Sequence, residues 1–357
     1  MKKTLLTICL VWMCFSLSAQ KIIDLSGKWS FSIDRQDNGE KEKWFSHTLN
    51  DFINLPGSMP EKLKGDEVTA KTQWTGSLYD SSYYYNPYME KYRKEGNIKF
   101  PFFLTPDKHY VGAAWYQKEV NIPADWKGER ILLFLERPHI ETTVWVNGQK
   151  TGMQNSLCVP HQYDITHYVR PGKCTITIRV DNRIKEINVG PDSHSITDQT
   201  QGNWNGIVGR ICLQTTPKTY FDDIQIYPEP EQKLARVKVV IKGTGTAKVK
   251  LSAESFNTDK KHIVPAIQQE IKLNKGVTET EMVLPMGNDM LLWDEFHPAL
   301  YKLKAEVTNG KKTEIKEIQF GMRRFEIKGK WFYVNGRKTQ LRGTVENCDF
   351  PLTGYAP

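Results

Sequence analysis

The sequence contains none of the short motifs that mark common catalytic chemistries. Among its 357 residues there is no His-Glu-x-x-His zinc motif, no phosphate-binding loop of the Walker type and no Gly-x-Ser-x-Gly nucleophile turn. Residues 243–246 lie between two alternating segments without a helix, which favours a hairpin loop over a nucleotide site. The eight histidines have no ligand-like spacing. We therefore predict no cofactor and no metal site.

The mature chain also lacks an apolar run long enough to cross a bilayer, and we predict no membrane span. The apolar stretch near the N-terminus has the features of a secretory signal peptide. Lys2 and Lys3 precede the apolar residues 4–15, and small residues precede a cleavage position near Ala19. We interpret residues 1–20 as a signal peptide and expect an exported protein, periplasmic or secreted.

Cysteine is scarce, and the excess of basic over acidic residues is small. Two of the six cysteines fall in the predicted signal peptide, and the other four are too widely spaced for a disulfide framework. An exported protein permits a disulfide, but buried free thiols are slightly favoured for Cys158, Cys174, Cys212 and Cys348. The formal net charge is +8, and Lys and Glu alternate in segments such as 311–314, which is typical of solvated strand faces. We predict no nucleic-acid partner.

Alternation of apolar and polar residues is the dominant pattern after residue 20, and long helical patterns are nearly absent. Clear examples are residues 175–180, 236–241 and 301–307. Asn-Gly pairs at Asn147, Asn309 and Asn335 follow such runs, and this pair is the strongest short hairpin signal because both residues tolerate positive φ. The sequence predicts an all-β protein built from sandwiches.

A break in the pattern near residues 227–231, rich in Pro and Glu, predicts a domain boundary. Residues 21–227 would form a large sandwich, and residues 228–322 have the length of one immunoglobulin-type sandwich. The aromatic stretch 74–92 is interpreted as a loop insertion into the first sandwich. Its tyrosines and Trp204 could stack on sugar rings, although for most of the tyrosines a small core beneath their own loop is favoured.

Several stretches, taken together and in order, resemble glycoside hydrolase family 2, which contains β-galactosidases, β-glucuronidases and β-mannosidases. The residues that carry this resemblance to the sugar-binding domain of the family are 48–59, 115–120, 133–136, 144–148, 163–166 and 203–210. Residues 292–303 are similar to the end of the family's immunoglobulin-like domain. Residues 320–326, 332–336 and 341–347 are similar to the hairpin and first strand that lead into its catalytic barrel.

The resemblance implies a galactose-binding-like jelly-roll sandwich, then an immunoglobulin-like sandwich, then a linker and the first strand of a truncated (β/α)₈ barrel in residues 323–357. In much of the family the loop after that strand reads Arg-Gly-x-Asn-x-His. Here Val345 and Asn347 replace the asparagine and the histidine, and only Arg342 is carried over as a substrate-binding residue. The resemblance also places Trp204 and Asn205 near the barrel mouth, as further substrate-binding residues.

The resemblance also indicates what the sequence lacks. The family's acid/base glutamate follows an asparagine, and the chain contains no Asn-Glu dipeptide. A (β/α)₈ barrel needs roughly 250 residues. We therefore expect no catalytic residue in this chain and no hydrolysis by it alone. The expected function is the N-terminal portion of an exported glycoside hydrolase that acts on a terminal β-linked sugar of a glycan. The alternatives are a stand-alone carbohydrate-binding protein without hydrolase activity and a structural module without a ligand.

Overall fold

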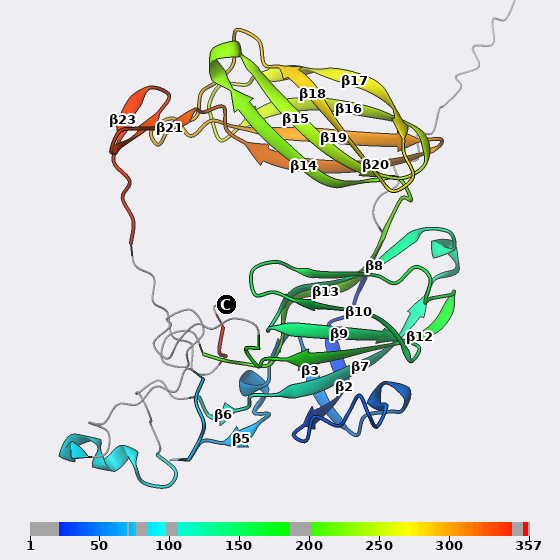
Figure 1. The fold of residues 1–357 in the computed structure, drawn as a ribbon, viewed down its shortest axis with the longest axis vertical. Coiled ribbons are helices and arrows are strands. Elements are labelled where there is room, and N and C mark those ends of the chain that lie inside the picture. Colours follow the sequence, from blue (N-terminus) through cyan, green and yellow to red (C-terminus); the bar gives the residue numbers. More distant parts are fainter. Residues whose placement is uncertain are drawn as a thin grey trace, which may run out of the picture. The chain divides into compact units, whose positions relative to one another are not determined.

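The computed structural model describes residues 21–69, 71–75, 85–97, 106–185, 202–344 and 353–355 (Figure 1). The chain divides into two compact units. The first unit combines Lys21–Thr216 with Arg342–Pro357, and the second contains Pro217–Leu341. The predicted signal peptide, Cys348 and three of the six tyrosines of the predicted insertion lie outside the described residues.

Strands make up nearly all of the regular structure, which confirms the prediction of an all-β protein. The helices among the described residues are short 3-10 turns, and none of them is long and apolar enough to cross a membrane. They are η1 (Trp44–Ser46), η2 (Pro60–Lys62), η3 (Pro87–Tyr92), η4 (Ala124–Trp126) and η5 (Pro230–Gln232).

The first unit is a sandwich of two antiparallel sheets. The six-stranded sheet has the order β10 (Gln149–Asn155), β9 (Glu141–Val146), β12 (Gly172–Asp181), β7 (Ala113–Ile122), β2 (Gly27–Asp34) and β3 (Asp51–Leu55). The five-stranded sheet has the order β1 (Ile22–Asp24), β13 (Gly206–Thr216), β8 (Arg130–Pro138) and β11 (His161–Asp164), with β4 (Gly57–Ser58) also paired to β13. A two-stranded ribbon of β5 (Asp66–Glu67) and β6 (Lys108–His109) lies beside them.

Strand β12 shows how the alternating pattern builds this sandwich. Its even-numbered residues Ile176, Ile178 and Val180 are buried in the core between the two sheets. Its odd-numbered residues Thr177 and Arg179 point to the other face and are also buried. The same sheet carries a second small cluster of Leu49, Trp115 and Trp145, with Trp44 and Phe45 packed against it. A segment between β2 and β3 therefore covers the outer face of β12.

The second unit is a seven-stranded antiparallel sandwich, as expected for an immunoglobulin-like domain. One sheet has the order β14 (Tyr220–Glu229), β15 (Leu234–Lys242) and β18 (Val277–Pro285). The other has the order β17 (Ile263–Leu273), β16 (Gly245–Phe256), β19 (Leu300–Asn309) and β20 (Lys312–Phe320). The alternation in residues 236–241 is that of β15, which buries Ala235, Val237, Val239 and Ile241.

The chain passes from the first unit to the second at Pro217, about ten residues before the sequence-based boundary. Strand β14 pairs along its whole length with β15, so the predicted boundary at residue 227 falls inside a strand of the second sandwich. Pro228 and Pro230 do interrupt the alternation, but they do so because an edge strand ends there and η5 turns the chain.

A small antiparallel sheet follows the second sandwich, formed by β21 (Phe325–Lys328), β22 (Trp331–Val334) and β23 (Arg337–Thr339). Asn335 and Gly336 connect β22 to β23 with φ of 49° and 78°, as a type I′ hairpin turn requires. Asn147 and Gly148 make the same kind of turn between β9 and β10. Residues 340–344 form no strand, so the first strand of a barrel stays a prediction.

Candidate functional site

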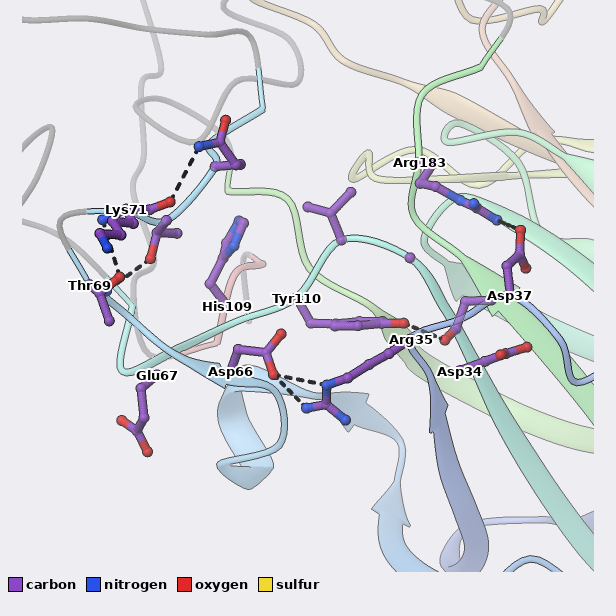
Figure 2. Close-up of a pocket in the computed structure, with 15 residues that line it drawn as sticks. Asp34, Arg35, Asp37, Asp66, Glu67, Thr69, Lys71, His109, Tyr110 and Arg183 are labelled. Atoms are coloured by element: carbon purple, nitrogen blue, oxygen red, sulfur yellow. Dashed lines mark hydrogen bonds and ion pairs between the residues drawn. The ribbon is translucent and has the colours of Figure 1, made fainter.

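A cleft of about 510 Å³ opens at one end of the first unit, where β2 ends and β7 begins. Its walls come from the turn after β2, the β5–β6 ribbon with the loop that follows β5, and the residue Arg183 after β12. Its volume lies in the range of pockets that hold small molecules. The charged and aromatic side chains that line the cleft are Asp34, Arg35, Asp37, Asp66, Glu67, Lys71, His109, Tyr110 and Arg183 (Figure 2).

Two ion pairs stand on opposite walls of the cleft. Arg35 reaches Asp66, with Nε 3.1 Å from Oδ1, and Arg183 Nη2 lies 2.7 Å from Asp37 Oδ2 (Figure 2). Tyr110 is buried between them, and its hydroxyl donates to the carbonyl of Ala113 at 2.9 Å. Burial and the nearby carboxylate of Asp34 raise the pKa of Tyr110 well above its ordinary value. The phenol is therefore a neutral donor and not a general base.

The cleft can bind polar groups, but its acids are already engaged. Asp34 is buried and accepts hydrogen bonds from the backbone of Asn38 and Gly39 and from Trp115 Nε1, each at 2.9 Å. The ion pairs place carboxylate acceptors beside guanidinium donors, which suits a ligand rich in hydroxyl groups. Because four carboxylates face three cations in the lining, the cleft favours a neutral ligand over an anionic one.

A buried network of charges supports one wall of the cleft. Asp181, at the end of β12, is fully buried and pairs with Arg179, Arg183 and Lys185. Burial alone would raise the pKa of Asp181, but hydrogen bonds from Arg183 and Lys185 and the charge of Arg179 hold it well below 3.8. The remaining members of the network are Asp37 and Glu141, which pair with Arg179 at 2.7 and 3.4 Å.

Three buried asparagines hold the rim of the same end of the sandwich. Asn182 accepts from the backbone of Gly112 and donates to the carbonyl of Tyr110, both at 2.8 Å. Asn203 donates to the carbonyl of Asn182 at 3.1 Å and to Thr75 Oγ1 at 2.9 Å. Asn205 completes the set. These amides join the start of β7, the end of β12 and the segment before β13 into one rim.

The predicted substrate-binding residue Asn205 is part of this rim. Its amide donates to the carbonyls of Gly112 and Val180 at 2.9 and 3.0 Å, and its oxygen accepts from the hydroxyl of Tyr116 at 2.7 Å. Its side chain is 1% exposed. With both amide hydrogens and the oxygen engaged, Asn205 has a structural role, which argues against its predicted contact with a sugar.

The other two predicted substrate-binding residues are Trp204 and Arg342. Trp204 is 7% exposed, stacks on His139 at a centroid distance of 4.6 Å and contacts Tyr355 at 5.5 Å. Its carbonyl also accepts from His139 Nδ1 at 2.7 Å. Arg342 is exposed and has no hydrogen-bond or ion-pair partner among the residues that the structure describes. Among the described residues, no hydrogen bond, ion pair or ring contact joins Arg342 to Trp204 or Asn205.

Sequence reasoning did not find the cleft. Arg35 and Asp66 are 31 residues apart, and Asp37 and Arg183 are 146 residues apart. No local motif joins either pair. Only the placement of the β2 turn beside β5 and beside the end of β12 makes them neighbours.

Comparison with known proteins decides the family. Residues 22–217 match the family model described as "Glycosyl hydrolases family 2, sugar binding domain", and residues 219–323 match "Glycosyl hydrolases family 2". The chain belongs to glycoside hydrolase family 2. The family resemblance seen in the sequence is thereby confirmed.

Curated relatives of this family 2 chain carry the names of two enzymes. It is 23% identical to β-glucuronidase of Paenibacillus borealis over 355 residues, which cover 94% of this chain and 51% of the relative. It is 24% identical to the β-galactosidase large subunit of Latilactobacillus sakei, over 92% of this chain and 51% of the relative. Human β-glucuronidase is 23% identical over 93% and 49% of the two chains. The chain thus spans about half the length of these relatives.

Solved structures show the same fold. The apo structure of β-glucuronidase from Ruminococcus gnavus matches with a TM-score of 0.61 and 19% identity, over 91% of this chain and 49% of that chain. The same enzyme in complex with D-glucuronic acid matches with a TM-score of 0.62. At this level of identity the likeness establishes the arrangement of strands.

Proposed function

We propose that this chain supplies the sugar-binding and immunoglobulin-like domains of an exported family 2 glycoside hydrolase. The observation that carries the proposal is the match to two family models, in order, over residues 22–217 and 219–323, together with relatives about twice as long. The whole protein would hydrolyse the O-glycosyl bond of a terminal β-linked sugar of a glycan. The names of the relatives favour a β-glucuronide or a β-galactoside as the substrate.

In this proposal the chemistry takes place outside the chain. A retaining glycosidase places two carboxyl groups about 5 to 5.5 Å apart across the scissile bond. The four acids of the cleft do not offer such a pair, because each is already engaged. Asp34 serves the fold, Asp37 pairs with Arg179 and Arg183, Asp66 pairs with Arg35, and Glu67 pairs with Lys108. A barrel beginning in residues 323–357 would supply the catalytic glutamates, with Arg342 at its substrate-binding loop.

The proposal is tested by activity and by gene sequence. Residues 21–357, assayed with chromogenic β-glucuronides, β-galactosides and β-mannosides, are expected to show no turnover. The DNA downstream of the codon for Pro357 is expected to encode a (β/α)₈ barrel. Turnover by residues 21–357 in the ordinary enzyme range, about 1 to 1000 per second, would refute the proposal that catalysis takes place outside this chain. Absence of barrel-coding sequence in every frame would refute the proposal that the chain is part of a longer glycoside hydrolase.

The cleft favours a second function, carbohydrate binding without hydrolysis. Its volume, its paired charges and its excess of carboxylates fit a neutral sugar. Calorimetric titration with neutral β-linked oligosaccharides is expected to show binding that Asp66→Asn weakens about ten-fold, because a hydrogen bond to a charged acceptor is lost. Glu279→Gln, in an exposed pair with Lys238 of the second unit, is the matched control and should bind as the unaltered chain does. No binding to any β-linked glycan would exclude this function.

A further inference from the structure

Residues Thr353–Tyr355 lie on the first unit, far in sequence from the residues that they contact. The surface beneath them is made by Ser58, Glu61, Arg137, Gly202 and Trp204, which we call the docking surface. It belongs to the same end of the sandwich as the asparagine rim, because Gly202 and Trp204 flank Asn203. None of the cleft residues takes part in it.

Polar contacts hold both ends of the segment. Ser58 Oγ donates to the carbonyl of Thr353, and the hydroxyl of Tyr355 donates to Glu61 Oε2 at 2.7 Å. The ring of Tyr355 lies 5.5 Å from that of Trp204, and the guanidinium carbon of Arg137 lies 5.9 Å from the Tyr355 centroid. One hydrogen bond, an aromatic pair and a cation–π contact therefore converge on Tyr355.

Gly354, between Thr353 and Tyr355, fits the docking surface because it has no side chain. Gly354 has φ of +78°, and a Cβ added to it would come within 2.8 Å of Trp204 Cβ. A Cβ on Gly202 would lie 3.5 Å from the Cα of Gly354. A side chain at position 354 would be strained in its backbone and would push the segment away from Trp204. The surface therefore selects for glycine at position 354 and for tyrosine at position 355, whereas it contacts Thr353 through the backbone carbonyl.

Glu61 is also held in place by contacts that do not involve residues 353–355. Its carboxylate accepts from the backbone of Ser58 at 3.4 Å while Ser58 Oγ accepts from the backbone of Glu61 at 3.3 Å, a reciprocal arrangement like a capping box. Partial burial would raise the pKa of Glu61, but hydrogen bonds from Lys62 and Tyr355 lower it. Burial and Glu61 raise the pKa of Tyr355 to about 12. At neutral pH an ionised acceptor thus meets a protonated donor.

We propose that the docking surface is the receptor for the chain's own Thr353–Tyr355 segment, and that Tyr355 takes the face of Trp204 that a sugar ring would otherwise use. The side chain of Trp204 lies between His139 and Tyr355, so its exposure is small for a structural reason. Tyr355 is then a positioning residue. This role rests on the proposed function: Tyr355 would hold residues 353–355 on the sugar-binding domain.

Hydrogen exchange of the 357-residue chain, read by mass spectrometry, tests the docking without any sugar or enzymatic assay. Tyr355→Phe and Glu61→Gln are each expected to speed amide exchange in residues 353–355 and 202–206 about ten-fold, because the first removes the donor and the second replaces a charged acceptor with a weaker neutral one. The double variant should exchange no faster than either single one. Tyr227→Phe is the control, since that exposed hydroxyl donates only to its neighbour Gln225.

Two results would overturn the proposal. One is exchange in residues 353–355 that is unchanged by both substitutions. The other is exchange in residues 353–355 of the unaltered chain as fast as in a free peptide of the same sequence, because the segment would then not be docked. Exchange in β12, in the core of the first unit, is the check on unfolding of that unit and should stay constant. Since no outcome depends on hydrolysis, docking can fail while the family 2 function stands, and the reverse also holds.

Discussion

The side chain of Asn205 joins three backbone segments at the rim of the first unit. It bonds to the carbonyls of Gly112 and Val180 and to the hydroxyl of Tyr116, and all of these groups are out of contact with water. We expect Asn205→Ala to lower the free energy of unfolding by about 2 to 4 kcal/mol, because buried polar partners are left unsatisfied. Urea unfolding followed by circular dichroism measures this loss.

Asn54 is the matched control for that prediction. It is exposed on β3 of the same unit, so Asn54→Ala should change the free energy of unfolding by no more than about 0.5 kcal/mol. A loss for Asn205→Ala as small as that for Asn54→Ala would show that water can replace the partners of the amide. The rim would then not depend on this residue.

At the scale of elements, charges join the turn after β2 to β9 and to the end of β12. Asp181 has a pKa below its ordinary 3.8 in the folded chain, so its ionised form stabilises the fold above that pH and the contribution is lost as the pH falls through the lower folded value. We expect Asp181→Asn to cost about 3 to 5 kcal/mol at pH 7, because it leaves the buried Arg179 without this partner. At pH 2 to 3 the difference from the unaltered chain should shrink.

Urea unfolding at several pH values provides the measurement. Glu119→Gln, in an exposed pair with Lys173, is the control and should show little effect at either pH. A cost for Asp181→Asn that stays constant from pH 7 to pH 2 would mean that shape rather than charge holds these elements together.

Elements of the second unit could be predicted from sequence because the interactions that determine them are local. In β15 every second residue is buried, and the turn at Asn335 and Gly336 has the dihedral angles that its residues favour. The rim could not be predicted in the same way. Trp204 has the features of a sugar platform in sequence, but it is covered by Tyr355, a residue about 150 positions later. Neither periodicity nor turn chemistry reports such distant contacts.

At the scale of the whole molecule, the first unit is discontinuous along the chain. Residues 21–216 and 342–357 share one unit, and the 125 residues of the second unit, Pro217–Leu341, separate them. Family membership could be read from sequence because ordered motifs cover both units. The return of the chain to the first unit could not, because it depends on three residues, Thr353–Tyr355, whose hydrogen-bond partners in β4 and η2 lie almost 300 positions earlier in the sequence.

This discontinuity has a consequence for biosynthesis. A ribosome adds about 5 to 20 residues per second, so roughly 6 to 25 seconds separate the emergence of Thr216 from that of Arg342. All strands of the first sandwich are available during that interval, while Tyr355 does not yet exist. A nascent chain would therefore carry Trp204 and Glu61 uncovered until Tyr355 emerges, and residues made after the second unit would complete the domain that was begun first.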